Sequence, residues 1–148
     1  MLAMDFLLHL LSTISIAVPA ALGYNFIFGK GKILHFGPGA TSLVSAYGVF
    51  LTLSATGNYL LGFLVGIMLG LVVSALFAWL SFRLEPDGLG ILSIAVHLVV
   101  LAAVLNTGNL TRGALGIPGI PRFPGMHTLS GFALVSGVIA VLWILAFR

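Results

Sequence analysis

Hydrophobic residues are concentrated in five long stretches of this chain, separated by short segments rich in glycine, proline and charge. The stretches cover residues 6–28, 38–56, 59–82, 89–105 and 127–147. A helix needs about 20 mostly apolar residues to cross the hydrocarbon core of a bilayer, and each stretch meets or approaches that length. Because lipid offers no partner for backbone amides, we predict that all five are helices. The pattern indicates an all-α integral membrane protein with a single transmembrane domain over residues 1–148.

The composition agrees with a chain that lies in membrane lipid. Hydrophobic residues make up 60% of the 148 and charged residues only 6%, and the mean hydropathy is +1.23. A soluble domain carries about 25% charged residues, so a fold surrounded by water is excluded. Six basic and three acidic residues are scattered along the chain and form no patch for a phosphate backbone, which excludes nucleic acid as a partner.

The second and third stretches are predicted to form a tight antiparallel hairpin, because only Gly57 and Asn58 separate them. Residues four apart lie on the same face of a helix, and the third stretch has a small residue at every fourth position. These residues are Gly62, Gly66, Gly70, Ser74 and Ala78. Small residues let a second helix approach closely. We expect the stripe to contact another helix of the bundle, with a homodimer contact as the alternative.

The junction of the first two stretches contains two glycine clusters and a proline. Gly29 and Gly31 are followed by the triplet Gly37, Pro38 and Gly39. Such residues interrupt helices, so we predict a broken helix near Gly37 to Gly39, with the next span beginning at Pro38. The start of a helix presents unpaired amides and the positive end of its dipole, which can receive an anionic group at membrane depth. An ordinary loop and helix start explain the spacing equally well.

Side chains suited to covalent chemistry are scarce. The acids are Asp5, Glu85 and Asp87, and none of them pairs with another acid inside a span. The four histidines do not have the spacing of a zinc site, and the chain has no cysteine. We therefore expect no catalytic residues, no metal and no cofactor, and an intramembrane enzyme is the weakest functional hypothesis.

A histidine lies in the middle of the fourth stretch. A polar side chain at that depth is expected to face the bundle or a wet cavity, which makes His97 a candidate for a transport path. The predicted path residues also include the helix break at Gly37, Pro38 and Gly39 and the hydroxyl of Ser42. A neutral histidine bonded to a neighbouring helix is the alternative interpretation of His97.

Basic residues in the short connections predict the orientation, because cytoplasmic loops carry an excess of lysine and arginine. With the N-terminus outside, four basic residues would be cytoplasmic and two external. The two sets are Lys30, Lys32, Arg83 and Arg148 against Arg112 and Arg122. We therefore expect the N-terminus outside and the C-terminus in the cytoplasm.

Residues 106–126 form a long connection between the fourth and fifth stretches, which this orientation places outside. Its glycines can adopt positive φ, and its prolines fix φ and lack an amide donor, so we predict a patterned loop that is not helical. This outer loop is a candidate for a docking or gating contact with an external protein. The residues that define it are Arg112, Gly113, Gly116, Pro118, Gly119 and Pro121.

Several segments resemble the N-terminal half of branched-chain amino-acid ABC importer permeases. Residues 21–29 read ALGYNFIFG, residues 36–40 read FGPGA and residues 46–48 read AYG. Further along, residues 80–84 read LSFRL, and the outer connection contains LNT, LTRG and GIPGIP at residues 105–107, 110–113 and 116–121. The last of these segments is the most specific part of a resemblance that extends from about Ala20 to Arg148.

The resemblance implies half of an ABC importer permease fold in a bacterial inner membrane. The chain would form part of the translocation path for branched-chain or related small amino acids, and it would not itself be an enzyme. Its implied partners are ABC ATPase subunits, a second permease subunit or the missing C-terminal half, and an external substrate-binding protein.

The chain departs from the family pattern in two places. Many relatives have Gly-His or Ala-His where this chain has Gly37 and Pro38, so the role of that histidine does not carry over. Family subunits also continue beyond the equivalent of Arg148 into an ATPase-docking loop and further spans. We therefore keep three alternatives: a split half-subunit, a non-transporting membrane scaffold or assembly subunit, and a degenerate truncated permease.

Overall fold

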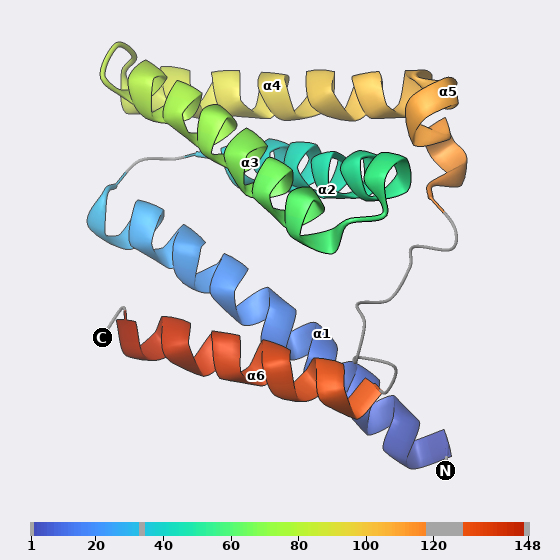
Figure 1. Cartoon of the computed structure of the whole chain (residues 1–148). Helices are drawn as coiled ribbons and strands as arrows, with labels where there is room; N and C mark the ends of the chain where they lie inside the picture. The colour runs from blue at the N-terminus through green and yellow to red at the C-terminus, as the bar shows by residue number, and fades with distance from the viewer. Residues whose placement is uncertain (1, 33–34, 118–128, 147–148) are drawn as a thin grey trace. The chain divides into compact units, whose positions relative to one another are not determined.

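The computed structural model describes residues 2–32, 35–117 and 129–146, and all regular structure in these residues is helical (Figure 1). This confirms the all-α fold predicted from the apolar stretches, and the five long helices begin and end within four residues of the predicted bounds. The chain forms two compact units. One unit comprises Met1–Lys32 with Pro121–Arg148, and the other comprises Ile33–Ile120.

The first unit consists of two long helices that pack against each other (Figure 1). α1 spans Leu2–Asn25 and continues as a π-helical turn, η1, over Phe26–Lys30, whereas α6 spans Leu129–Ala146. At Gly137 of α6 a Cβ would lie 3.9 Å from the Ser15 hydroxyl of α1. Small residues on both helices therefore allow their backbones to approach closely.

The second unit contains the predicted antiparallel hairpin, formed by α2 (Gly37–Thr56) and α3 (Tyr59–Ser81). Gly57 ends α2 in the left-handed region at φ 66°, and its N–H donates to the Leu53 carbonyl at 2.8 Å. The Asn58 side chain then caps α3 by accepting two amides of its first turn at 3.0 and 3.3 Å. A glycine C-cap followed directly by an asparagine N-cap explains why two residues suffice to reverse the chain.

α2 covers part of the stripe of small residues on α3. Gly62, Gly66 and Gly70 are buried. A Cβ at Gly62 or at Gly66 would lie 3.1 or 3.0 Å from a backbone carbonyl of α2, so the two helices are nearly in backbone contact there. Ser74 and Ala78 are exposed, which shows that α2 covers the stripe only as far as Gly70.

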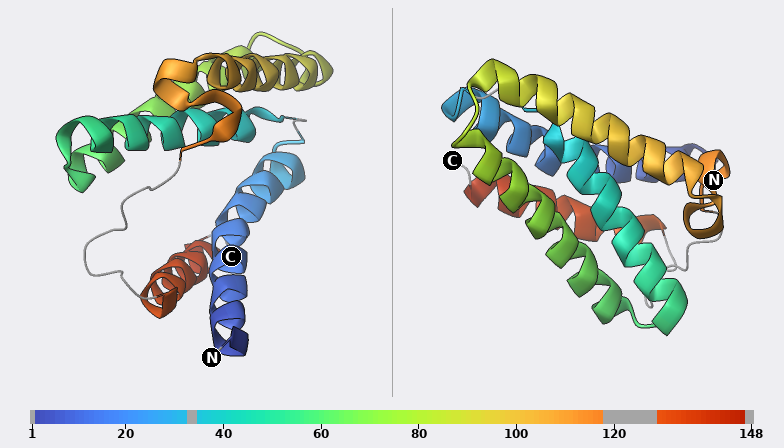
Figure 2. Two further views of the ribbon diagram at one scale, coloured as in Figure 1. Left: turned by 90° about the vertical axis from the view of Figure 1, so that its right-hand side faces the viewer. Right: turned by 90° about the horizontal axis from the view of Figure 1, so that it is seen from above.

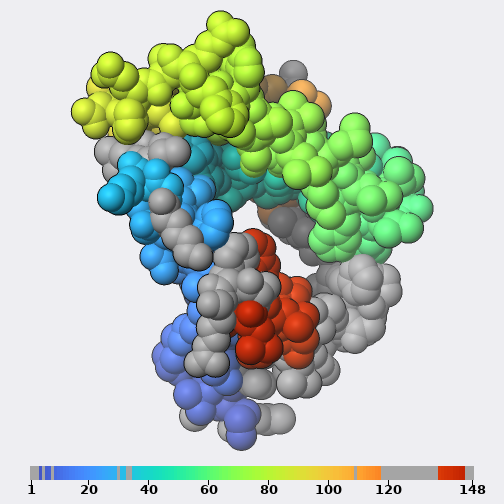
Figure 3. Space-filling view, turned by 90° about the vertical axis from the view of Figure 1, so that its left-hand side faces the viewer, coloured from blue at the N-terminus to red at the C-terminus, as the bar shows by residue number. Residues whose placement is uncertain are grey.

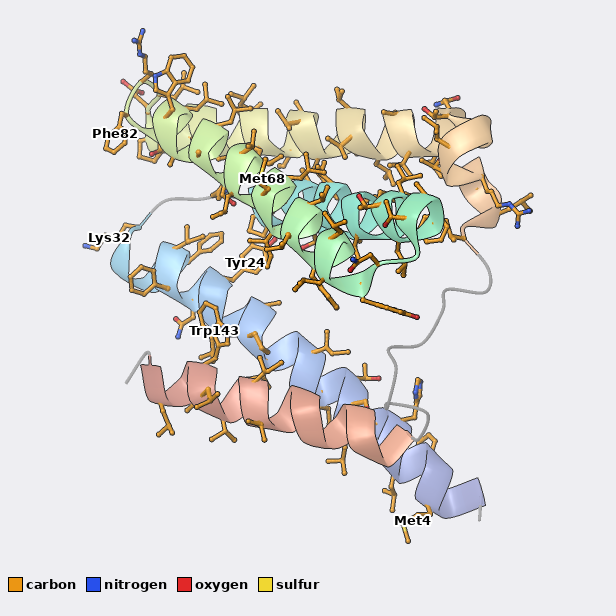
Figure 4. All side chains as sticks on the ribbon, viewed as in Figure 1. Met4, Tyr24, Lys32, Met68, Phe82 and Trp143 are labelled. Carbon is orange, nitrogen blue, oxygen red and sulfur yellow. The ribbon has the colours of Figure 1, made fainter. Side chains whose placement is uncertain are left out.

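α4 spans Pro86–Asn106 and packs against α2, with a smaller contact to α3 (Figure 2). It follows α3 after a turn in which the Arg83 guanidinium lies 5.0 Å from the centre of the Trp79 ring, a cation–π contact. Met68 of α3 and Phe82 of the turn are exposed and point away from the helices (Figure 4). The side chains of α3 form a continuous outer surface in the space-filling view (Figure 3).

Three helical segments of the described chain are long and apolar enough to cross a membrane: His9–Gly29, Tyr59–Ser81 and Pro86–Asn106. α2 is not one of them, because its 20 residues include three glycines and six serines or threonines. The large apolar side chains exposed on α1, α3 and α4 suit contact with lipid. That α2 and α6 also cross the membrane stays a prediction.

The connection after α4 is partly helical, contrary to the prediction. α5 spans Gly108–Thr111, and a 3-10 turn, η2, spans Gly113–Leu115. The Thr111 hydroxyl donates to the Thr107 carbonyl at 2.8 Å, within this first turn. Glycine and proline spacing predicted where the backbone bends, but it did not reveal the helical turn between the bends, in which the Leu110 and Thr111 amides donate to the Thr107 carbonyl.

Candidate functional site

Side chains from three parts of the second unit meet at the first turn of α2. His35 comes from the connection before α2, Phe77 from α3, and Ser93 and His97 from α4. Ser93 and His97 are four residues apart and therefore share one face of α4. These four side chains and the first turn of α2 are called the α2-start cluster below.

The two glycines of the Gly-Pro-Gly triplet make room for these side chains. A Cβ at Gly37 would overlap the His35 ring and lie 2.7 Å from Cε2 of Phe77. A Cβ at Gly39 would lie 2.8 Å from both Cε1 and Nδ1 of His97. Carbon atoms do not approach other atoms so closely, so both positions require glycine. The triplet is therefore a packing feature in which aromatic rings lie directly on the helix backbone.

The first amides of α2 are bonded within the protein. Phe36 is the N-cap residue, and its N–H donates to the Ser93 hydroxyl at 2.9 Å. The Gly37 N–H donates to Nδ1 of His35 at 3.3 Å, and Pro38 has no N–H. Side chains of the protein therefore occupy the Phe36 and Gly37 amides, which favours the ordinary helix start over the anion-receiving one.

The His35 ring is held as a neutral hydrogen-bond acceptor. It lies in the connection between α1 and α2, and burial lowers its pKa because the charged ring would lose hydration. Its ring meets that of Phe77 edge-on, with 4.6 Å between the centroids and 63° between the planes. A neutral ring leaves Nδ1 able to accept the Gly37 N–H, so the lowered pKa and this hydrogen bond favour each other.

Reasoning from the sequence missed Ser93 as a site residue. Its side chain is fully buried, and its hydroxyl accepts the Phe36 N–H while donating to the Gly90 carbonyl at 2.8 Å. This hydroxyl joins α4 to the start of α2 across 57 residues of chain. The one signal in the sequence was its position four residues before His97, on the same face of α4.

His97 lies against Gly39, and its Nδ1 atom is buried without a hydrogen-bond partner among the described residues. A neutral imidazole carries one donor and one acceptor nitrogen, and each normally finds a partner when buried. The sequence-based alternative, a histidine bonded to a neighbouring helix, therefore does not hold for this nitrogen.

The structure brings together only some of the predicted path residues. Gly37, Gly39 and His97 belong to the α2-start cluster, and Pro38 lies between the two glycines. Ser42 is exposed, and its hydroxyl donates to the Pro38 carbonyl one turn earlier at 2.7 Å. Such bonding to the preceding turn is common for serine in helices, and it leaves Ser42 outside the cluster.

Polar side chains form a cap at the end of α4. The side chains of Asn106 and Thr107 donate to the carbonyls of Ala102 and Ala103, both at 2.7 Å. The Thr111 hydroxyl lies within hydrogen-bonding reach of the Val104 and Thr107 carbonyls, which share its single hydrogen. Carbonyls run out of intrahelical partners where a helix ends. The cap therefore supplies donors to the Ala103 and Val104 carbonyls in the last turn of α4.

The backbone of the connection after α4 bends at residues with positive φ. Gly113 and Gly116 have φ angles of 58° and 66°, as their spacing predicted, and Arg112 also adopts φ 59° and is exposed. Gly113 lies so close to the end of α4 that a Cβ would be 2.6 Å from the Leu105 carbonyl. The remaining residues of the predicted loop pattern lie outside the described residues: Pro118, Gly119 and Pro121.

Known proteins resemble the chain over most of its length. Residues 6–147 match the family described as the permease component of branched-chain amino acid transport systems. A relative from Haloferax volcanii, provisionally named glucose ABC transporter permease protein TsgC13, is 37% identical over 108 residues. That match covers 70% of this chain but only 30% of the relative. No solved structure matches the chain significantly.

Proposed function

The chain belongs to the family of permease components of branched-chain amino-acid transport systems, and from this premise we propose that it forms part of the translocation path of an ABC importer. The match over residues 6–147 carries the proposal, because it includes nearly the whole of every long helix. In this role the helices line a path and perform no covalent chemistry. ATP hydrolysis belongs to separate ABC ATPase subunits.

The complete importer contains further membrane spans. The match covers 30% of the relative's length, which supports a partner in the form of a second permease subunit or a C-terminal half. An external substrate-binding protein delivers the solute. The membrane in this proposal is the bacterial inner membrane.

The proposed substrate is a small polar solute without net charge. A branched-chain amino acid is the first candidate, from the family description, and a sugar is the second, from the name of the relative. Two of the amides at the start of α2 are bonded to side chains and are not available to a carboxylate. The charged side chains with described surroundings are all exposed, and they are Lys32, Arg83, Glu85, Asp87 and Arg112.

Purification from the native membrane, followed by reconstitution, tests the proposed function. We expect the chain to co-purify with an ATPase subunit, and proteoliposomes of the complex to accumulate labelled leucine or glucose when ATP is supplied. A complex whose ATPase subunit cannot hydrolyse ATP is the control. A chain that associates with no ATPase and supports no uptake would instead be a membrane scaffold or a degenerate permease.

The proposed orientation places Arg112 outside and Lys32 in the cytoplasm. Both side chains are exposed, and the chain has no cysteine of its own. A single introduced cysteine is therefore the one thiol of this chain that a maleimide can label. We expect Arg112→Cys to react with a membrane-impermeant maleimide in intact cells, and Lys32→Cys to react only after the cells are opened. The reverse labelling pattern would contradict this orientation.

A further inference from the structure

We infer that the contact between α4 and the start of α2 opens during transport, with the Ser93 hydroxyl holding it closed and the unpaired His97 nitrogen opposing closure. This motion presupposes the proposed transport function. It adds to that function the helices that move and the two side chains that set the balance between the closed and open arrangements.

Ser93 holds the contact closed. Its buried hydroxyl accepts the N–H of Phe36, the residue that begins α2, at 2.9 Å. It also donates to the Gly90 carbonyl in its own helix, so its hydrogen atom and a lone pair are both used. Separating α4 from α2 therefore breaks a partly buried hydrogen bond, and this resists opening.

His97 opposes the same contact. Its ring lies on the backbone at Gly39, too close for a water molecule between them, and its Nδ1 atom is buried without a partner among the described residues. A buried polar atom without a hydrogen bond destabilises the arrangement that buries it. When α4 moves away from Gly39, this nitrogen reaches water or a solute and becomes hydrogen-bonded.

The two faces of α2 differ in the contacts that they make. Toward α3, the backbone meets the glycines Gly62 and Gly66, and no buried side-chain nitrogen or oxygen of the described residues is left unpaired at that contact. Toward α4, the first turn carries both the Ser93 bond and the unpaired His97 nitrogen. A packed contact that one side chain stabilises and another destabilises is suited to two discrete arrangements. We therefore expect α2 and α3 to move as a pair relative to α4.

The variant His97→Leu tests whether the unpaired His97 nitrogen destabilises the closed contact. Leucine is apolar and needs no hydrogen bond, so the closed contact should become more stable. Replacing a histidine in a packed position normally destabilises the folded protein, so this expectation is specific to the unpaired nitrogen. We expect the melting temperature of the purified complex to rise by about 2–4 °C and ATP-driven uptake to fall several-fold. The variant Ser93→Ala removes the hydroxyl that accepts the Phe36 N–H, and its melting temperature should fall by a similar amount.

Hydrogen exchange gives a readout that does not depend on uptake. The peptide that contains residues 35–42 should exchange more slowly in His97→Leu and faster in Ser93→Ala than in the unmodified chain. The matched controls are His9→Leu on α1 and Ser54→Ala on α2, since both side chains are exposed. Neither control should change the melting temperature or the exchange of this peptide.

The outcomes separate this inference from the proposed function. A melting temperature that stays the same or falls in His97→Leu would overturn the strained contact. A higher melting temperature with unchanged uptake would overturn its opening during transport. If the unmodified complex takes up no solute, the proposed function fails and the transport motion fails with it, while exchange and melting still decide whether the contact is strained.

Discussion

Replacing Gly66 by leucine should separate α2 from α3 and remove most of the folded protein from the membrane. A Cβ at this position would already overlap Cγ2 of Val49 and lie 3.0 Å from the Ser45 carbonyl. The carbonyl belongs to the backbone of α2 and cannot rotate away as a side chain can. The rest of a leucine side chain has no space between the helices, so the hairpin must open.

Overpacking of a core by small groups usually costs about 1–3 kcal/mol. We expect Gly66→Leu to destabilise the protein by more than this, because a whole side chain must be accommodated. Thermal unfolding of the detergent-solubilised chain and its abundance in membranes measure the effect. Gly88→Leu on α4 is the matched control, since a Cβ at Gly88 meets no atom within 4 Å. Equal abundance of the two variants would show that α2 does not pack on the glycine face of α3.

Replacing Gly113 by alanine should disrupt the cap at the end of α4. The backbone there has φ 58°, and a Cβ would lie 2.6 Å from the Leu105 carbonyl. A left-handed conformation costs an alanine about 1–2 kcal/mol, and the overlap with a backbone carbonyl adds about 1–3 kcal/mol. Because the turn cannot close, the Thr111 side chain should lose its bonds to the helix end.

Gly57→Ala isolates the steric part of this effect. Gly57 is left-handed, with φ 66° and ψ 5°, but a Cβ there meets no atom within 4 Å. It should therefore show only the conformational cost of about 1–2 kcal/mol. Melting temperatures of the two variants, measured side by side, give the comparison. If Gly113→Ala melted at the same temperature as Gly57→Ala, the turn would not press on α4.

The apolar pattern predicted the helices well because length and hydropathy are local properties of the chain. The two-residue connection at Gly57 and Asn58 likewise predicted the hairpin, since each residue acts on the helix end beside it. The stripe on α3 predicted a close helix contact, but not that α2 covers it only as far as Gly70. How far two helices overlap depends on their crossing, which a stripe on one of them does not specify.

The α2-start cluster was harder to predict, because its contacts join distant parts of the chain. Nothing near Phe36 indicates that its amide is bonded to a serine 57 residues away. The spacing of Gly37 and Gly39 fitted equally well a helix break with exposed amides and an ordinary helix start, and it did not reveal that their absent side chains make room for rings from other elements. Glycine spacing alone does not distinguish room for a ligand from room for a neighbouring side chain.

The cap at the end of α4 has a consequence for the depth of this helix in the bilayer. A helix whose last carbonyls rely on water must keep that end at the membrane surface, because bare carbonyls in hydrocarbon are costly. Asn106, Thr107 and Thr111 pair carbonyls of α4 from within the chain. The carbonyls of Ala102, Ala103 and Val104 therefore need no water, and the depth of this end of α4 in the bilayer depends on the carbonyls that follow them.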